Sequence, residues 1–278
     1  MKSKILRSNI LVLSLVFIFT SCDWNSHKTS NKNQPYTGEH FHLTCDSTSL
    51  FWFDAIHSND INEKMFVDLE KEFDDFSPDL LLVEGGYDKV ITNTKEEAIA
   101  KGESAFSVFL ANKSQVTTKD IEPPFSTQIA YLQSKYASEE ILTMYLIRQL
   151  GSIQAAPVKE EFDLESLLIE ETRFFIKNGL NIDSTSLSLE QVFDIMNKYL
   201  PKKINSDNWN DQFYPRIYAK KGGALYAVYN DVVQFRNIYL IDFFKEQQQE
   251  YNRIFIVMGK QHLQDTKEEL LKIYNCAL

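Results

Sequence analysis

Positive charge is scarce in this sequence of 278 residues, which has 29 Lys and Arg residues against 39 Asp and Glu residues and a formal net charge of −10. No stretch of the chain concentrates its basic residues. Because a protein that binds nucleic-acid phosphates needs a concentrated basic surface, the composition argues against a nucleic-acid partner. The sequence also has no internal repeat and no long low-complexity tract.

Cysteine is equally scarce, and the three cysteines are Cys22, Cys45 and Cys276. Their spacing is not that of a metal site. Cys22 follows an apolar segment near the N-terminus, so Cys45 and Cys276 remain as candidates for a disulfide in an oxidising compartment. The sequence alone leaves that pairing open.

A long hydrophobic run is also missing. The apolar segment at residues 10–19 is shorter than the roughly 20 residues that a membrane-spanning helix needs. It follows three basic residues and ends in small residues before Cys22, a pattern typical of a bacterial lipoprotein signal peptide over residues 1–21. The alternative, a buried N-terminal helix, would have no polar face. We therefore expect lipidation at Cys22, which would anchor the protein in a lipid bilayer of the cell envelope, facing the periplasm.

Residues 22–37 are polar without an apolar period and predict a flexible tether, which leaves residues 38–278 for a folded domain. Apolar strands are expected at residues 49–54, 80–83 and 253–258, with a weaker strand at 115–121, and helical segments separate them. This order predicts an α/β fold with a mixed, largely parallel sheet and flanking helices.

The middle of the chain has the helical period. Helices are expected over residues 126–149, 164–177, 187–200 and 224–251. They predict a helical insertion or cap at about residues 125–250. The alternative is that these helices pack directly on the sheet, and length does not separate the two arrangements.

Polar side chains follow four of the expected strands, at the point where each strand ends. They are His57, Glu84, Glu122 and, after Gly259, His262. A short crossover helix implies that the strands before His57 and Glu84 are parallel neighbours, so both side chains would lie at the carboxyl edge of one sheet, where α/β folds bind ligands. The alternative is that these residues are ordinary hydrogen-bonded turn residues.

Imidazole and carboxylate groups together suit a divalent cation such as manganese, zinc or cobalt, or an activated water. His57, Glu84 and His262 are therefore the candidate metal ligands. Asp54 and Asp60 are candidate accessory groups, although Asp60 would serve equally well as the N-cap of the following helix.

Two further residues carry charge at informative positions. Glu103 opens a short helix, where a carboxylate also complements the helix dipole, and Arg236 falls in an otherwise apolar helix. An interior arginine needs a carboxylate partner, for which we expect Glu84 or Glu103. The alternative is that Arg236 lies at the surface, on the polar stripe that includes Asn237.

Taken together, these short motifs resemble the TraB/TIKI (GumN) family, within the superfamily that includes erythromycin esterase and ChaN-like lipoproteins. The resemblance rests on Gly259-x-x-His262, Asp54-x-x-His57, Glu84-Gly85, Gly102-Glu103, Glu122-Pro123 and Arg236-Asn237. It implies an α/β fold with two Gly-x-x-His motifs. The first motif departs from the family pattern, because Asp54 stands where glycine is expected. A Gly-Glu-x-x-His spacing at residues 38–42 is similar to the esterase motif but lacks a preceding strand.

The resemblance implies a hydrolase, either a metal-dependent peptidase or an esterase that uses His and Glu without a tightly held metal. In that reading His57, His262 and Glu84 bind a cation or position water, Glu103 or Glu122 acts as the base, and Arg236 stabilises negative charge or holds a carboxylate. The substrate would be a peptide, an ester or another small molecule. Two alternatives stay open: a non-catalytic lipoprotein that binds haem or a small ligand, and a structural envelope protein.

Overall fold

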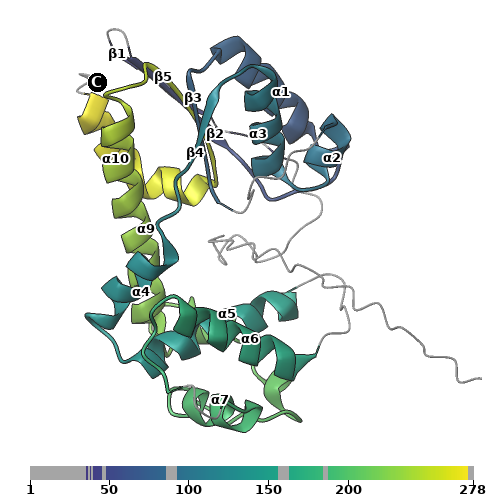
Figure 1. Ribbon diagram of the computed structural model, residues 1–278, viewed down its shortest axis with the longest axis vertical. Coiled ribbons are helices and arrows are strands. Elements are labelled where there is room, and N and C mark those ends of the chain that lie inside the picture. The colour runs from purple at the N-terminus through teal and green to yellow at the C-terminus, as the bar shows by residue number, and fades with distance from the viewer. Residues whose placement is uncertain are drawn as a thin grey trace, which may run out of the picture.

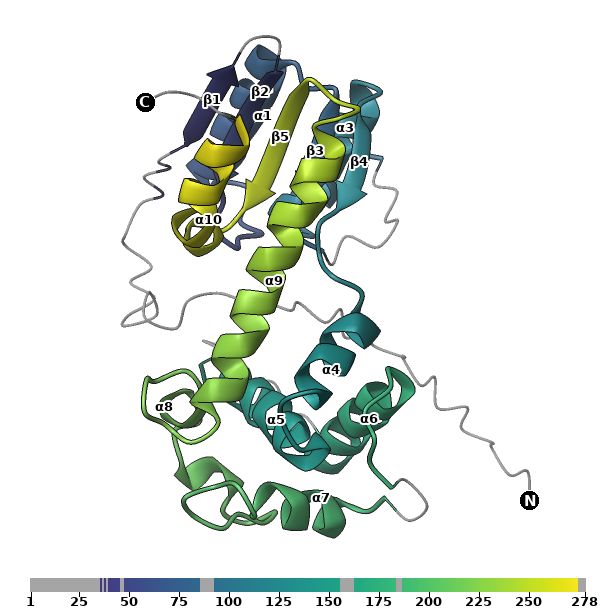
Figure 2. The same ribbon diagram turned by 90° about the vertical axis from the view of Figure 1, so that its left-hand side faces the viewer.

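The computed structural model describes residues 36, 38, 40–45, 48–85, 93–155, 163–183 and 187–274. The fold is α/β, as predicted: helices cover both faces of a largely parallel, five-stranded sheet, and a lobe made only of helices lies beyond one edge of it (Figures 1 and 2). Of the helices described, none combines the length and the apolar composition needed to cross a membrane.

The sheet has the strand order β1-β2-β5-β3-β4, in which β1 runs antiparallel to β2 and the other neighbours are parallel. The strands are β1 (Phe41–Cys45), β2 (Thr48–Asp54), β3 (Leu80–Val83), β4 (Thr117–Asp120) and β5 (Arg253–Met258). β5 comes from the end of the chain and inserts between β2 and β3. The expectation that the strands before His57 and Glu84 are direct neighbours is therefore wrong.

Both faces of the central strands are buried, because alternate side chains enter two separate cores. On one face, Phe53, Val83 and Phe255 pack with α1 (Lys64–Phe76), α2 (Lys95–Ile99) and α3 (Glu103–Lys113). On the other face, Trp52, Leu82 and Ile256 pack with α9 (Tyr226–Gln247) and α10 (Lys260–Tyr274). Continuous apolar strands of this kind are typical of parallel sheets covered on both sides.

The helical lobe has a hydrophobic core of its own. It contains α4 (Phe125–Gln133), α5 (Ser138–Ala155), α6 (Leu164–Lys177), α7 (Leu189–Met196) and α8 (Pro215–Tyr218), with a 3-10 turn at Trp209–Asp211. The helix expected over residues 126–149 is two helices, since Ser134 donates its hydroxyl to the carbonyl of Tyr131 and ends the first.

One helix belongs to both lobes. α9 has 22 residues, so it is about 33 Å long. Val228 and Val232 in its first half enter the core of the helical lobe, whereas Leu240 and Phe244 in its second half pack on the sheet. Both arrangements expected for the middle of the chain therefore occur. Figure 2 shows α9 passing from one lobe to the other.

Several expectations fall outside the described residues. Residues 1–35 include the expected signal peptide, the lipidation site Cys22 and most of the tether, so these stay predictions. Cys45 is disulfide-bonded, whereas Cys276, the other candidate for a disulfide, is not among the described residues. Glu39, of the esterase-like spacing at residues 38–42, is not among them either.

Candidate functional site

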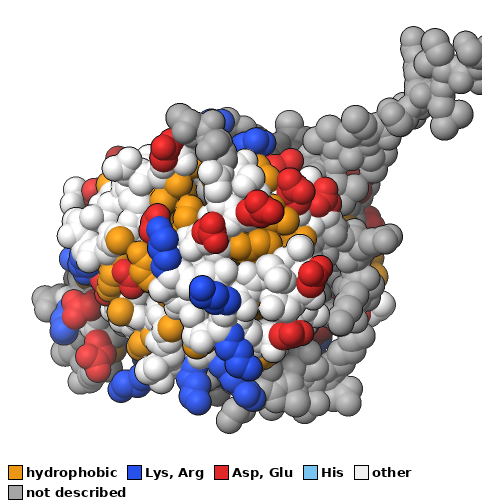
Figure 3. Space-filling view, turned by 90° about the horizontal axis from the view of Figure 1, so that it is seen from below, with side chains coloured by type: hydrophobic (Ala, Val, Ile, Leu, Met, Phe, Trp, Pro, Cys, Tyr) orange, Lys and Arg blue, Asp and Glu red, His pale blue; other side chains and the backbone are white. Residues whose placement is uncertain are grey.

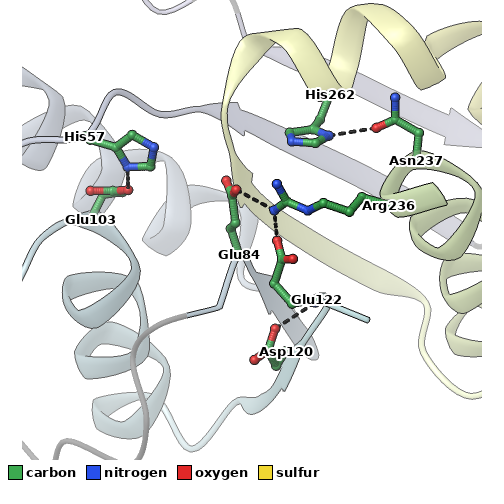
Figure 4. A network of polar contacts seen from close by, with 8 residues as sticks. All are labelled: His57, Glu84, Glu103, Asp120, Glu122, Arg236, Asn237 and His262. Carbon is green, nitrogen blue, oxygen red and sulfur yellow. Dashed lines mark hydrogen bonds and ion pairs between the residues drawn. The ribbon is translucent and has the colours of Figure 1, made fainter. Parts of the chain in front are cut away.

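The carboxyl ends of the parallel strands meet at one edge of the sheet. The strand register places Asp54 opposite Met258 and Val83 opposite both Val257 and Asp120. The polar residues that follow these strands therefore share one site, as Figure 4 shows. His57, Glu84, Glu122 and His262 all lie there, together with side chains from α3 and α9.

The centre of the site is an arginine held by two carboxylates. Arg236 donates through Nη2 to Glu84 Oε1 at 2.8 Å and also to Glu122 Oε1. The side chains of Arg236 and Glu84 are 5% and 10% exposed, so the alternative of a surface arginine is wrong and the expected partner Glu84 is confirmed. The other expected partner, Glu103, contacts His57 instead. Arg236 Nε has no hydrogen-bond partner among the described residues.

The two carboxylates titrate differently. Burial raises the pKa of Glu84, but the charge of Arg236, with a smaller contribution from His262 and His57 when these rings are protonated, outweighs burial and lowers that pKa to about 2. The pKa of Glu122 is raised, because burial and the nearby charge of Glu84 together exceed the effect of the shared Arg236. One carboxylate of the pair is thus firmly ionised, and the other takes up a proton more readily.

Glycine at position 85 allows the chain after β3 to lie close to the side chains of Glu122 and Asp120. A Cβ atom on Gly85 would lie 2.9 Å from Glu122 Cγ and 3.1 Å from Asp120 Oδ2. Asp120 in turn accepts a hydrogen bond from the backbone N–H of Glu122 at 2.7 Å and so fixes the turn after β4. The Glu84-Gly85 and Glu122-Pro123 motifs therefore form one packed unit.

His57 pairs with Glu103 across the site. The distance from His57 Nδ1 to Glu103 Oε1 is 2.5 Å, and the two side chains are 33% and 11% exposed. An ionised carboxylate accepts only, so Nδ1 carries the proton and the neutral ring has its lone pair on Nε2. Glu103 is the first residue of α3, which Gly102 enters with a φ of +97°, a conformation that favours glycine.

His262 is held by Asn237, which the sequence analysis named only as part of a motif, and through it by Asp265, which the sequence analysis missed. Its Nδ1 lies 2.7 Å from Asn237 Oδ1, and Asn237 Nδ2 donates to Asp265 Oδ2 at 3.1 Å. The carboxylate of Asp265 orients the amide, which makes Nδ1 of His262 the donor and leaves the lone pair on Nε2. Burial, followed by the charge of Arg236, lowers the pKa of His262 to about 4, so this ring is neutral at pH 7.

The accessory residues take different positions. Asp54 ends β2 and is 9% exposed. Asp60 is exposed and accepts a hydrogen bond from the backbone N–H of Asn62 at 3.0 Å, whereas the N-cap of α1 is Glu63. The expectation of an N-cap at Asp60 is therefore wrong. A Cβ atom on Gly259 would meet no atom within 4 Å.

The described residues do not offer a conventional metal site. Among them, no three His, Cys, Asp or Glu side chains come together in a way that could hold a metal ion. Arg236 also places a positive charge 2.8 Å from Glu84, which opposes a divalent cation on that carboxylate. No step proposed below depends on a metal.

The helical lobe contributes aromatic side chains beside this edge. Phe125 follows Glu122 by three residues, and its ring centroid lies 5.5 Å from that of Tyr145 and 5.1 Å from that of Phe174. Gln128 donates to the Tyr145 hydroxyl at 2.5 Å. Burial raises the pKa of Tyr145.

Sequence motifs could indicate only part of this site. The sequence contained one weak signal for the residues that hold His262, since Asn237 directly follows Arg236 and Asp265 lies one helical turn after His262. Comparison of the chain with protein-family models, curated proteins and solved structures gives no match, so the resemblance to the TraB/TIKI family stays a prediction.

Proposed function

We propose that this protein is a hydrolase of the bacterial cell envelope that cleaves an ester or a peptide bond at the carboxyl edge of its sheet. One observation carries the proposal: two histidines, each oriented through Nδ1 by an oxygen acceptor, lie on either side of a buried carboxylate-arginine pair (Figure 4). Such an arrangement is suited to proton transfer next to a group that binds negative charge.

In this proposal His57 is the general base. Its Nε2 takes a proton from the attacking water, and Glu103 stabilises the imidazolium that forms, because it lies 2.5 Å from Nδ1. The same proton then passes from His57 to the leaving group. Glu103 therefore orients His57 and stabilises its imidazolium form, and it does not act as the base itself.

Arg236 has the geometry to stabilise the oxyanion. Its Nη2 is occupied by Glu84 and Glu122, whereas the other terminal nitrogen points toward the side of the site on which His262 lies (Figure 4). A buried donor placed where negative charge develops contributes more than the same donor would in water. His262, neutral and with its lone pair on Nε2, would accept a hydrogen bond from the bound water or substrate.

The test is turnover of p-nitrophenyl acyl esters and fluorogenic peptides by the mature chain with Cys22→Ser. We expect His57→Gln to lower kcat at least 100-fold, the usual contribution of a general base, without a change in the melting temperature. His42→Gln, an exposed histidine on β1, is the matched control and should retain full activity. Unchanged turnover in His57→Gln would contradict the proposal.

The divalent cations and the haem predicted as cofactors are tested with the same protein. Thermal unfolding is measured with manganese, zinc, cobalt and haemin, because a ligand that binds only the folded state raises its stability. Stabilisation by haemin together with an absence of turnover would favour the ligand-binding alternative. Stabilisation by a divalent ion that His57→Gln removes would restore the metal-dependent form of the hydrolase.

A further inference from the structure

The helical lobe carries a group of exposed basic side chains, which we call the basic surface. They come from three short segments that the fold brings together. Gln212 donates to the carbonyl of Lys202 at 2.9 Å, and Gly223 packs against the backbone carbonyls of Arg216 and Lys220. The basic surface consists of Lys202, Lys203, Arg216, Lys220 and Lys221.

These five cations have no ion-pair partner among the described residues. Eight lysines elsewhere do have one, namely Lys64, Lys71, Lys95, Lys119, Lys135, Lys198, Lys245 and Lys272, whereas Lys101, Lys113, Lys177 and Lys267 have none among the described residues. The acidic residues on the same segments are Asp207 and Asp211. In a chain of net charge −10, these segments therefore carry a local excess of positive charge.

An exposed aromatic ring lies within the basic surface. Phe213 is 41% exposed, and the guanidinium carbon of Arg216 lies 5.5 Å from the centre of its ring. Figure 3, which views the molecule from the end of the helical lobe, shows Lys and Arg side chains gathered along one side with hydrophobic side chains beside them. Basic side chains around an exposed aromatic ring are typical of proteins that lie on a lipid surface.

We propose that the basic surface docks on a bilayer that contains anionic phospholipid. The lysines and Arg216 would pair with lipid phosphates, and Phe213 would enter the headgroup layer. The lipid expected at Cys22 would bring the protein to such a bilayer. The chain from Cys22 to Tyr36 spans 14 residue steps and reaches at most about 50 Å when extended.

The test is sedimentation of the mature chain with Cys22→Ser, which has no lipid anchor, on vesicles of phosphatidylcholine with and without phosphatidylglycerol. Each cation near an anionic surface strengthens binding about fivefold. We expect the double variant K220Q/K221Q to bind phosphatidylglycerol vesicles about 25-fold more weakly, and F213A to lose affinity as well. K101Q/K113Q, which removes two exposed lysines near α3, is the control of equal net charge and should bind as the parent does.

Three results with vesicles would each overturn the proposal. They are equal loss of binding in K220Q/K221Q and K101Q/K113Q, equal binding to neutral and anionic vesicles, and no binding of the parent chain to phosphatidylglycerol at low salt. Binding of a short RNA without binding to vesicles would also overturn it, since the same cations would then have a different anionic partner. Circular dichroism of each variant checks that it is folded.

Discussion

Replacement of Arg236 by leucine gives the sharpest test of the electrostatics at the centre of the site. Arg236 and Glu84 have side chains that are 5% and 10% exposed, so R236L would leave a buried carboxylate without its cation. Removing one partner of a buried ion pair costs about 3–5 kcal/mol. The pKa of Glu84 gives a similar value: its fall from 4.5 to about 2 corresponds to about 3 kcal/mol at neutral pH, at about 1.4 kcal/mol per pKa unit.

The sign of the pH dependence follows from the same shift. In the parent protein the pKa of Glu84 is depressed, so its contribution to stability is complete above pH 4.5 and is lost as the pH falls through about 2. In R236L burial alone would raise that pKa, and the carboxyl would take up a proton as the pH falls. In the parent, the raised pKa of Glu122 offsets part of the stability that ionised Glu84 contributes. The stability difference between the two proteins should therefore shrink from pH 7 to pH 4.

Urea unfolding followed by tryptophan fluorescence at pH 7 and pH 4 measures this difference, since Trp52 is fully buried. R173L removes an exposed arginine from α6 and is the matched control, with an expected change within about 0.5 kcal/mol. The reasoning is refuted if R236L costs less than about 1 kcal/mol at pH 7, or if its cost is the same at both pH values.

Three further predictions concern the same edge of the sheet. G85A should lower the free energy of unfolding in urea by about 1–2 kcal/mol, because its Cβ would lie 2.9 Å from Glu122 Cγ. G259A, whose Cβ would meet no atom within 4 Å, should lower it by under about 0.5 kcal/mol. Equal losses in the two variants would contradict the packing argument. The ring of His262 should stay neutral until the pH falls to about 4, and an NMR titration in which it gains its proton near pH 6.5 would contradict the effect assigned to its burial. N237L should leave Nδ1 of His262 without its acceptor and lower kcat, and a kcat restored by N237Q would show that the amide orients the ring.

The sequence predicted the fold class and the ends of the strands because those signals are local. Unbroken apolar runs mark buried strands, and the polar or glycine residues after them mark where the chain leaves the sheet. The need of a buried arginine for a carboxylate also predicted the contact between Arg236 and Glu84. Each of these inferences uses either a few adjacent residues or the free-energy cost of burying a charge without a partner.

Contacts between distant segments could not be predicted in the same way. β5 lies between β2 and β3 although about 170 residues separate it from β3, and no local pattern encodes that insertion. Glu103 was one of two partners expected for Arg236 but contacts His57, and the charge rule could not separate the two pairings because both satisfy it. The orientation of His262 depends on Asn237 and Asp265, from two different helices, and only the packing of α9 against α10 brings them together.

The position of α9 in two hydrophobic cores makes the molecule one cooperative unit. If the helical lobe opened by itself, Val228 and Val232 would leave their core, and α9 would have to break near Arg236 or pull Leu240 and Phe244 from the sheet. Opening of the helical lobe alone therefore costs more free energy than it would if the two lobes shared no helix. A small molecule bound at the sheet edge should slow amide hydrogen exchange throughout α5, in the far lobe, even though it contacts no backbone there.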